Sequence, residues 1–332
     1  MLLRRPAYFD RFRCIAAACP DSCCKEWDVL VDDATARHYL TLPGPLGDDL
    51  RTLLQQDGDG DWYFPIIDGR CPMWRADGLC RIQAQEGHDA LCQTCRDFPR
   101  LKHDYGSFAE QGLALSCPEA ARLIFSQDDT WLEQEIPGGE EPEYDPADMD
   151  LLLQTRNTVL QLLSDPLRPV PETLALALLY GYRVQDALDG GDAVPFDPAS
   201  ELAFARSVAK PGDSTALRDF YLQLEILTDT WHRRLQSPAG DPHWDPRLLT
   251  FARYGVSRYW LQAISDLDLV GRVKMIIAGC VLLHLLGGDT ENTAQLYAKE
   301  IENDADNIDA ILDGAYTSPA LTDDKLLGLL LL

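Results

Sequence analysis

Residues 14–27 read CIAAACPDSCCKEW, and this stretch opens a series of nine cysteines that ends at Cys117. The tenth cysteine, Cys280, lies far away in an apolar stretch with helical spacing. Core packing alone does not produce such clustering, although a single free cysteine often serves as a small buried hydrophobe. The sequence therefore predicts a front third of the chain built around thiol chemistry, with Cys280 as a buried core residue.

The nine cysteines fall into close groups beside turn residues. Closely spaced thiolates on tight turns suit tetrahedral zinc, and they equally suit an iron–sulfur cluster, so the spacing does not separate the two. A disulfide scaffold is disfavoured because the count in this region is odd and no export signal is visible. The predicted metal ligands are Cys14, Cys19, Cys23, Cys24, Cys71, Cys80, Cys92, Cys95 and Cys117.

Cys23 and Cys24 are adjacent, and neighbouring side chains on extended backbone point in opposite directions. We therefore expect one of them to bind a metal while the other packs or serves a second site. His38, His88 and His103 lie near the cysteine blocks and could complete a mixed site, but a surface or satisfied histidine is the favoured interpretation of each.

Four later blocks follow the opening stretch in order. They are DGRCPMW at residues 68–74, GLCRIQ at 78–83, LCQTCRDFPR at 91–100 and LSCPEAAR at 115–122. Together with residues 13–27, this series resembles the flagellin lysine-N-methylase family, within a superfamily of zinc- or iron-chelating proteins marked by a CxxCxxCC pattern. The resemblance implies methyl transfer to the ε-amino groups of flagellin lysines. It also implies S-adenosylmethionine as the donor and an iron–sulfur cluster, of the 4Fe-4S type with zinc as the alternative, in the cysteine-rich region.

A methyl-donor site is not visible in the sequence. The glycine pairs at 138–139, 190–191 and 287–288 are isolated, and none forms the strand, glycine turn and helix of a Rossmann-type site. The CxxxCxxC spacing of radical S-adenosylmethionine enzymes begins at Cys19 and Cys23, but Glu26 occupies the place of the third cysteine. Neither a conventional methyltransferase fold nor standard radical chemistry is therefore expected.

The net charge of -25 and the isoelectric point near 4.4 argue against a nucleic-acid or anionic-membrane partner, because such partners require a basic face. The same acidity could steer a lysine-bearing protein toward the chain. No secretory signal is visible at the N-terminus, and no segment reaches the roughly 18 to 20 uninterrupted apolar residues of a membrane span. We expect a cytoplasmic protein with flagellin or another lysine-bearing protein as its partner.

The fold class predicted is mainly α, with an irregular cysteine-rich, metal-binding N-terminal region followed by a helical, bundle-like domain. We place the first domain at residues 1–126, a Pro/Gly/Glu-rich linker at 127–147 and the helical domain at 148–332. Strand signals are nearly absent. Apolar residues at helical spacing predict helices over residues 149–164, 171–189, 214–235, 246–265, 267–286 and 290–303, and the apolar tail 326–332 is interpreted as packed helix.

Methylation of lysine requires a neutral amine, so the site must desolvate or deprotonate a group whose unperturbed pKa is about 10.4. Hypothetical candidates are the side chains beside the cysteine blocks: Glu26, Asp28, Asp97 and Tyr105. Surface charge is the plainer interpretation of each, and no catalytic residue is assigned. A different class of function stays open, in which the chain is a non-enzymatic zinc- or iron-binding adaptor; binding of S-adenosylmethionine discriminates the two.

Overall fold

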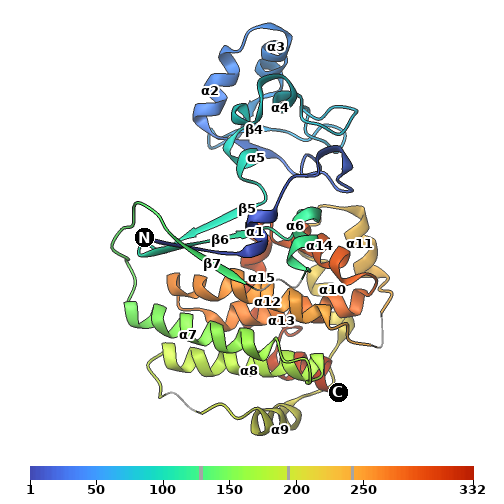
Figure 1. Ribbon diagram of the computed structural model, residues 1–332. Coiled ribbons are helices and arrows are strands. Elements are labelled where there is room, and N and C mark those ends of the chain that lie inside the picture. The colour runs from blue at the N-terminus through green and yellow to red at the C-terminus, as the bar shows by residue number, and fades with distance from the viewer. Residues whose placement is uncertain (127–129, 193–194, 241–242) are drawn as a thin grey trace.

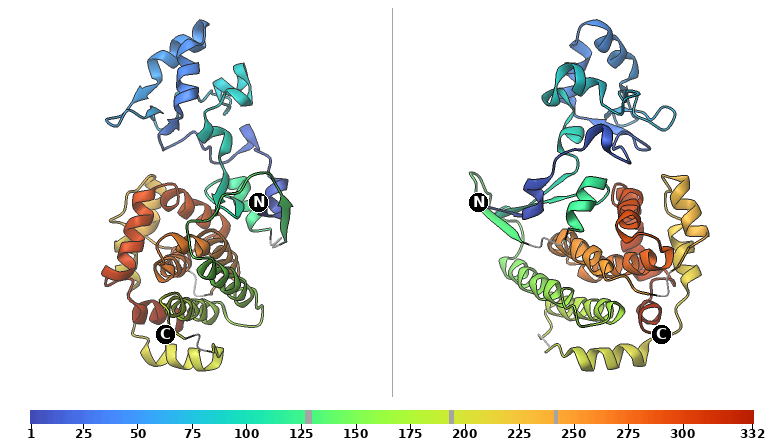
Figure 2. Two further views of the ribbon diagram at one scale, coloured as in Figure 1. Left: turned by 90° about the vertical axis from the view of Figure 1, so that its left-hand side faces the viewer. Right: turned by 45° about the vertical axis from the view of Figure 1, so that its right-hand side comes forward.

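The computed structural model describes residues 1–126, 130–192, 195–240 and 243–332. The described chain forms a small lobe and a larger helical body (Figure 1). The chain passes from α1 (Ala7–Arg11) into the small lobe and returns through α5 (Gln93–Asp97) into strand β5 (Arg100–Asp104). Both views in Figure 2 show the small lobe standing at one end of the body.

The small lobe packs short helices against a three-stranded antiparallel sheet of order β2-β4-β3. Its core buries residues from every part of the lobe, among them Val29, Tyr39, Leu50 and Met73. Two of the cysteines, Cys71 and Cys92, are buried in the same core. The elements of the lobe are η1 (Ala16–Ala18), β2 (Val29–Val31), α2 (Asp33–Thr41), α3 (Gly44–Leu53), β3 (Gln55–Gln56), β4 (Trp62–Phe64), α4 (Arg81–Glu86) and η2 (His88–Ala90).

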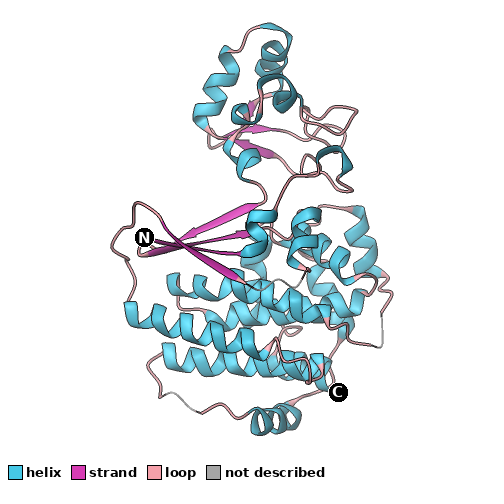
Figure 3. Cartoon of the chain, in the orientation of Figure 1, coloured by secondary structure: helices cyan, strands magenta, loops and turns pink. Residues whose placement is uncertain are grey.

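A four-stranded sheet of order β5-β6-β1-β7 covers one side of the helical body, as the magenta arrows in Figure 3 show. Strand β1 (Leu2–Pro6) pairs in parallel with β6 (Phe108–Leu113) and antiparallel with β7 (Trp131–Glu135). The sheet therefore unites the first residues of the chain with residues that lie more than 100 positions later. The prediction that strands are nearly absent missed it, because its pairings are long-range and its strands are short.

The helical body is built around α13 (Leu269–Leu286), whose residues are buried on nearly all sides against α8, α12 and α15. This helix is long and apolar enough to cross a membrane by composition, but 89% of its 18-residue window is buried inside the protein. The other helices are α6 (Pro118–Ile124), α7 (Pro146–Leu162), α8 (Val170–Leu188), α9 (Pro198–Val208), α10 (Ser214–Tyr221), α11 (Asp229–Gln236), α12 (Arg247–Tyr259), η3 (Trp260–Ser265), α14 (Thr290–Ile301), α15 (Ala305–Thr317) and α16 (Asp323–Leu331).

The prediction of a mainly α chain is confirmed, and most predicted helices lie within a few residues of their observed bounds. The exception is the predicted helix 214–235, which is split into α10 and α11. Thr228 caps α11 by accepting a hydrogen bond from the Trp231 N–H at 3.1 Å. Just before α11, the Asn307 side chain accepts a hydrogen bond from the Glu225 N–H and donates one to the Glu225 carbonyl, at 2.9 Å each. The backbone between α10 and α11 therefore bonds to Asn307 of α15 instead of continuing the helix.

Two other expectations about the body are confirmed. Leu326, Leu327 and Leu330 of the apolar tail are buried within α16, and Cys280 is fully buried in α13. The large hydrophobic core also includes Phe12 and nine residues between Tyr105 and Phe125, which belong to the predicted cysteine-rich domain. The predicted linker contributes strand β7 to the sheet. The domain boundary itself stays a prediction, and the first three linker residues lie outside the described residues.

Candidate metal centre and acidic pocket

Three of the nine clustered cysteines stand directly before a helix: Cys80 before α4, Cys92 before α5 and Cys117 before α6. Backbone N–H groups at the start of each helix point toward these thiols, and for Cys117 the donors are Ala120 and Glu119. N–H groups and the positive end of a helix favour the thiolate form, which is the form that binds metal. These N–H groups lower the pKa of the thiols, but for Cys80 and Cys117 burial outweighs them and raises the pKa overall.

One group of thiols gathers where the small lobe joins the body. It comprises Cys14, Cys19, Cys23 and Cys117. Burial raises the pKa of Cys117 to about 11, and the neighbouring thiols of Cys19 and Cys14 add to the rise. Burial also raises the pKa of Cys19, with a contribution from Cys14. Residues more than 90 positions apart in sequence therefore share one electrostatic environment.

A second group lies inside the small lobe and comprises Cys24, Cys71, Cys80, Cys92 and Cys95. The Cys71 N–H donates a 2.8 Å hydrogen bond to the Cys24 carbonyl, which holds the two segments together. Burial raises the pKa of Cys71 to about 12, and Cys24 leads the neighbouring thiols that add to the rise. A hydrogen bond between the thiols of Cys92 and Cys95 raises the pKa of Cys95 and lowers that of Cys92.

Cys23 and Cys24 connect the two groups. Their thiols hydrogen-bond to each other, which lowers the pKa of Cys24 and raises that of Cys23. The pKa of Cys23 is also raised by Cys14 and Cys117, Cys24 raises the pKa of Cys71 and Cys80, and both Cys23 and Cys24 raise the pKa of Cys95. The hydrogen bond holds the two thiols side by side, although neighbouring side chains are expected to point apart, and which of them binds a metal stays a prediction.

The thiols are all free. Across the parts of the chain that the structure describes, no set of three or more His, Cys, Asp or Glu side chains is closely enough arranged to hold a metal ion. The nine-cysteine ligand set therefore stays a prediction. His38 and His88 are exposed, and His103 on β5 lies 3.4 Å from the Gln262 amide of η3.

Helix α14 anchors the cysteine segment to the body. The Nζ atom of Lys299 lies 2.9 and 3.0 Å from the carboxylate oxygens of Asp21 and 2.6 Å from Glu26. One turn earlier, Gln295 donates to the Ser116 carbonyl at 2.6 Å and to Asp21 at 3.3 Å. Lys299 and Gln295, on one face of α14, thus bind both the 19–26 segment and Ser116, the residue before Cys117.

An acidic pocket of about 460 Å³ lies between this segment and the body. Of the residues that the structure describes, six carboxylates and one cation line it together with Trp27; the cation is Lys299 and the carboxylates are those of Glu26, Asp28, Glu225, Glu300, Asp304 and Asp306. Trp27 supplies an aromatic wall and donates its indole N–H to the Cys23 carbonyl at 2.8 Å. The pocket is therefore continuous with the cysteine segment.

Glu300 is the most buried carboxylate of the pocket, at 1% exposure. It accepts hydrogen bonds from the Leu227 N–H at 2.8 Å and from the Thr228 hydroxyl at 2.5 Å. Burial raises its pKa above the usual value even though both hydrogen bonds act to lower it. The pocket thus holds one carboxyl that binds a proton more readily than an exposed glutamate does.

The structure separates the four catalytic candidates. Glu26 and Asp28 line the acidic pocket, although Asp28 also accepts the Ile66 N–H at 2.9 Å. Asp97 is exposed at the end of α5, and Tyr105 is buried against Phe108 in the body core. Sequence reasoning missed Glu300, since a glutamate in a helix 180 residues beyond the cysteines carries no local signal.

Three known proteins are similar in sequence to this chain, and their names refer to lysine methylation or to flagella. A lysine-N-methylase of Salmonella typhimurium is 36% identical over 130 residues, which cover 37% of this chain and 32% of that protein. A lysine-N-methylase of Salmonella choleraesuis is 35% identical over the same length. The match spans about a third of each of these two proteins. No family model and no solved structure matches the chain.

A third relative is covered over most of its length. The flagellar biosynthetic protein FliU of Salmonella muenchen is 35% identical over 130 residues, which cover 77% of that protein. With its ordered cysteine blocks, the chain belongs to the flagellin lysine-N-methylase family.

Proposed function

We propose that the chain transfers methyl groups from S-adenosylmethionine to the ε-amino groups of lysines in flagellin. The acidic pocket carries this proposal, because it lies against the cysteine segment and shares Glu26 and Trp27 with it. The relatives' names support a methylating function on lysine and a connection to flagella. We place the reaction in the cytoplasm, where thiols are kept reduced and available to a metal.

The pocket matches a lysine side chain in both charge and shape. Six carboxylates against one lysine give it a negative potential that attracts an ammonium group. The Trp27 ring would pack against the methylene chain of the substrate and offer its face to the cation. Its volume of about 460 Å³ exceeds what one lysine needs, so room is left for the adjoining backbone of a protein substrate.

The substrate must lose a proton before it can accept a methyl group. Glu300 is the group we assign to this step, because burial raises its pKa and it lies in the pocket wall. The neutral nitrogen then attacks the methyl carbon of the sulfonium donor. A carbon–nitrogen bond forms as the carbon–sulfur bond breaks, and S-adenosylhomocysteine leaves as the neutral thioether.

The donor chemistry of the thiols supports an iron–sulfur cluster, since soft thiolates beside N–H donors at helix starts are the ligands that such clusters use, although the described thiols are not arranged around one point in this structure. The four thiolates that a 4Fe-4S cluster takes would come from the nine clustered cysteines, with Cys23 and Cys24 as the link between the two thiol groups. When bound, a cluster would supply electron-transfer chemistry and a covalent tie between the segments. Zinc is the alternative metal, and it would supply the tie alone.

A structural adaptor is the second candidate function. It is favoured by one observation: the thiols of Cys14, Cys19 and Cys23 gather with Cys117 at the junction of the lobe and the body, where a metal would staple the two. In that case S-adenosylmethionine would not bind.

The test starts with anaerobic purification of the full chain, followed by iron, zinc and sulfide analysis. The protein is then incubated with flagellin and S-adenosylmethionine that carries a labelled methyl group. We expect iron with matching sulfide and label on flagellin lysines. Absence of both donor binding and label would reject the enzyme in favour of the adaptor, and zinc without sulfide would reject the cluster.

A further inference from the structure

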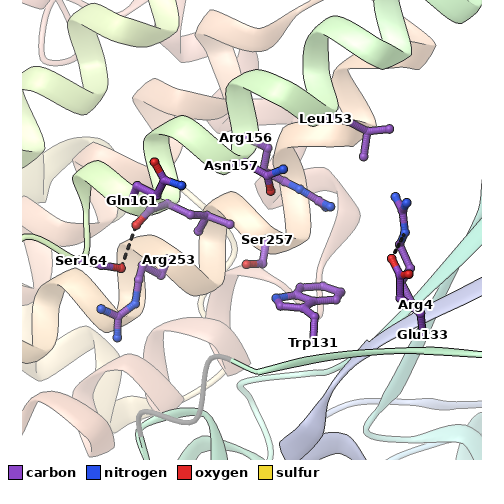
Figure 4. Close-up of a pocket in the computed structure, with 11 residues that line it drawn as sticks. Arg4, Trp131, Glu133, Leu153, Arg156, Asn157, Gln161, Ser164, Arg253 and Ser257 are labelled. Atoms are coloured by element: carbon purple, nitrogen blue, oxygen red, sulfur yellow. Dashed lines mark hydrogen bonds and ion pairs between the residues drawn. The ribbon is translucent and has the colours of Figure 1, made fainter.

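A second cavity, of about 560 Å³, lies between the sheet and the helical body (Figure 4). Strands β1 and β7 form one wall, and α7 and α12 form the other. The described residues of its lining include no cysteine, and none of them lines the acidic pocket. A role for this cavity therefore does not depend on the proposed methyl transfer.

The periodicity of each element explains how the lining is assembled. Arg156, Asn157, Leu160 and Gln161 recur at helical spacing on one face of α7. Trp131 and Glu133 are two apart on β7, so both point to the same side of the sheet. Figure 4 shows Trp131 facing this stripe of α7 across the cavity.

Arginine side chains gather in this cavity although the chain carries a net charge of -25. Among the residues that the structure describes, Arg4, Arg156 and Arg253 line it together with one carboxylate, Glu133. The Arg156 side chain is buried, at 7% exposure, and both of its terminal nitrogens donate hydrogen bonds to the Glu110 carboxylate, at 2.6 and 2.7 Å. Because Glu110 already neutralises it, the guanidinium of Arg156 is held in the cavity wall even when no ligand is bound.

Several polar groups in the lining have no hydrogen-bond partner within the described residues. The Nε–H of Arg156 is buried and unpartnered. Arg4 uses only its Nε, in a 3.1 Å bond to Glu133, and leaves both terminal nitrogens available. The side chains of Asn157, Gln161 and Ser257 make no hydrogen bond to other described residues. A buried donor such as the Arg156 Nε–H is normally satisfied, so its convergence with the exposed amides of Asn157 and Gln161 points to a polar ligand.

We propose that this cavity binds a small anionic molecule that carries a flat ring, of the size of a mononucleotide. Arg4 would hold the anionic group, since a guanidinium presents paired donors to phosphate or carboxylate oxygens. Trp131 would stack on the ring, and the amides of Asn157 and Gln161 would bind its polar edge. The cavity volume lies within the range of about 300 to 1,000 Å³ that is typical of small-molecule sites.

The test is calorimetric titration of the full chain with AMP, and with adenosine as the ligand that lacks the anion. We expect AMP to bind and adenosine to bind about tenfold or more weakly, because one charge-assisted contact is worth about that factor. Arg4→Gln should weaken AMP binding by a similar factor and leave adenosine unchanged. Asn157→Ala and Gln161→Ala, both at exposed positions, should weaken both ligands without unfolding the protein.

Arg206→Gln is the matched control, because Arg206 pairs with Glu172 on helices outside this cavity. It should bind AMP as the wild type does. The proposal is overturned if AMP does not bind at millimolar concentration, or if Arg4→Gln and the two amide variants all bind AMP with unchanged affinity.

Discussion

Replacing Lys299 by methionine should loosen the contact between the cysteine segment and the body. The ammonium of Lys299 is 7% exposed and bridges Asp21 and Glu26, which are 28% and 33% exposed. Burial by itself would lower the pKa of Lys299, but the hydrogen bonds to Glu26 and Asp21 raise it above its usual value. A raised lysine pKa means that the stabilisation is fully present below about pH 10.5 and is lost only at higher pH.

The magnitude follows from the exposure of the partners. Removing one member of a fully buried pair costs about 3 to 5 kcal/mol, because the other charge is left buried. Asp21 and Glu26 are about a third exposed and can be partly solvated, so we expect a loss of about 2 kcal/mol in the free energy of unfolding. Methionine keeps most of the volume, which limits any packing loss.

The assay is urea denaturation at neutral pH, followed by circular dichroism and by tryptophan fluorescence. Lys102→Met is the control, since Lys102 is 51% exposed and pairs with an exposed aspartate; it should lose less than about 0.5 kcal/mol. A double-mutant cycle with Asp21→Asn should show coupling. The reasoning is refuted if Lys299→Met costs no more than the control, or if the cycle shows no coupling.

Three further predictions concern separate features. Arg156→Met leaves Glu110 buried and unpaired, so we expect a loss of about 3 to 5 kcal/mol by urea denaturation; a loss below 1 kcal/mol would contradict the buried pair. Burial, and then the charge of Arg258, lower the pKa of His103 below 6.5, so the unfolded chain takes up its proton first as the pH falls. Stability should therefore drop below about pH 6.5, and His103→Gln should flatten that dependence; an unchanged pH profile would refute it. Cys117→Ser should lower the metal content of the purified protein, whereas Cys280→Ser, in the body core, should keep it; equal metal content would exclude Cys117 as a ligand.

Much of the helical body could be predicted from the sequence, because its signals are local. The apolar spacing of α7, α8 and α13 and their helix-start residues identify each helix within a few positions. The break between α10 and α11 could not be predicted, since it depends on Asn307 and Glu300 binding the backbone of residues 225–227. Those partners lie more than 70 residues away in sequence.

The four-stranded sheet was missed for the same physical reason. Strand β1 is stabilised by β6 and β7, which are remote in the chain, and β7 lies in a stretch whose composition predicts a linker. The cysteines and Glu26 of the candidate site could be predicted from the sequence, because they lie in or beside the cysteine blocks. Glu300, Lys299 and Glu225 come from two other parts of the chain, and only the packing of α14 and the 225–227 segment against the lobe brings them to Glu26.

The most direct test of the account is the rate of methyl transfer to flagellin at substrate concentrations below KM. The wild type is compared with Glu300→Gln, which removes the proposed proton acceptor, and with Glu172→Gln, the same change on α8 away from the acidic pocket. We predict that Glu300→Gln lowers kcat/KM by about a hundredfold, as expected for loss of a general base, and that Glu172→Gln leaves it unchanged. Equal kcat/KM for Glu300→Gln and the wild type would contradict the claim that lysine is methylated in this pocket.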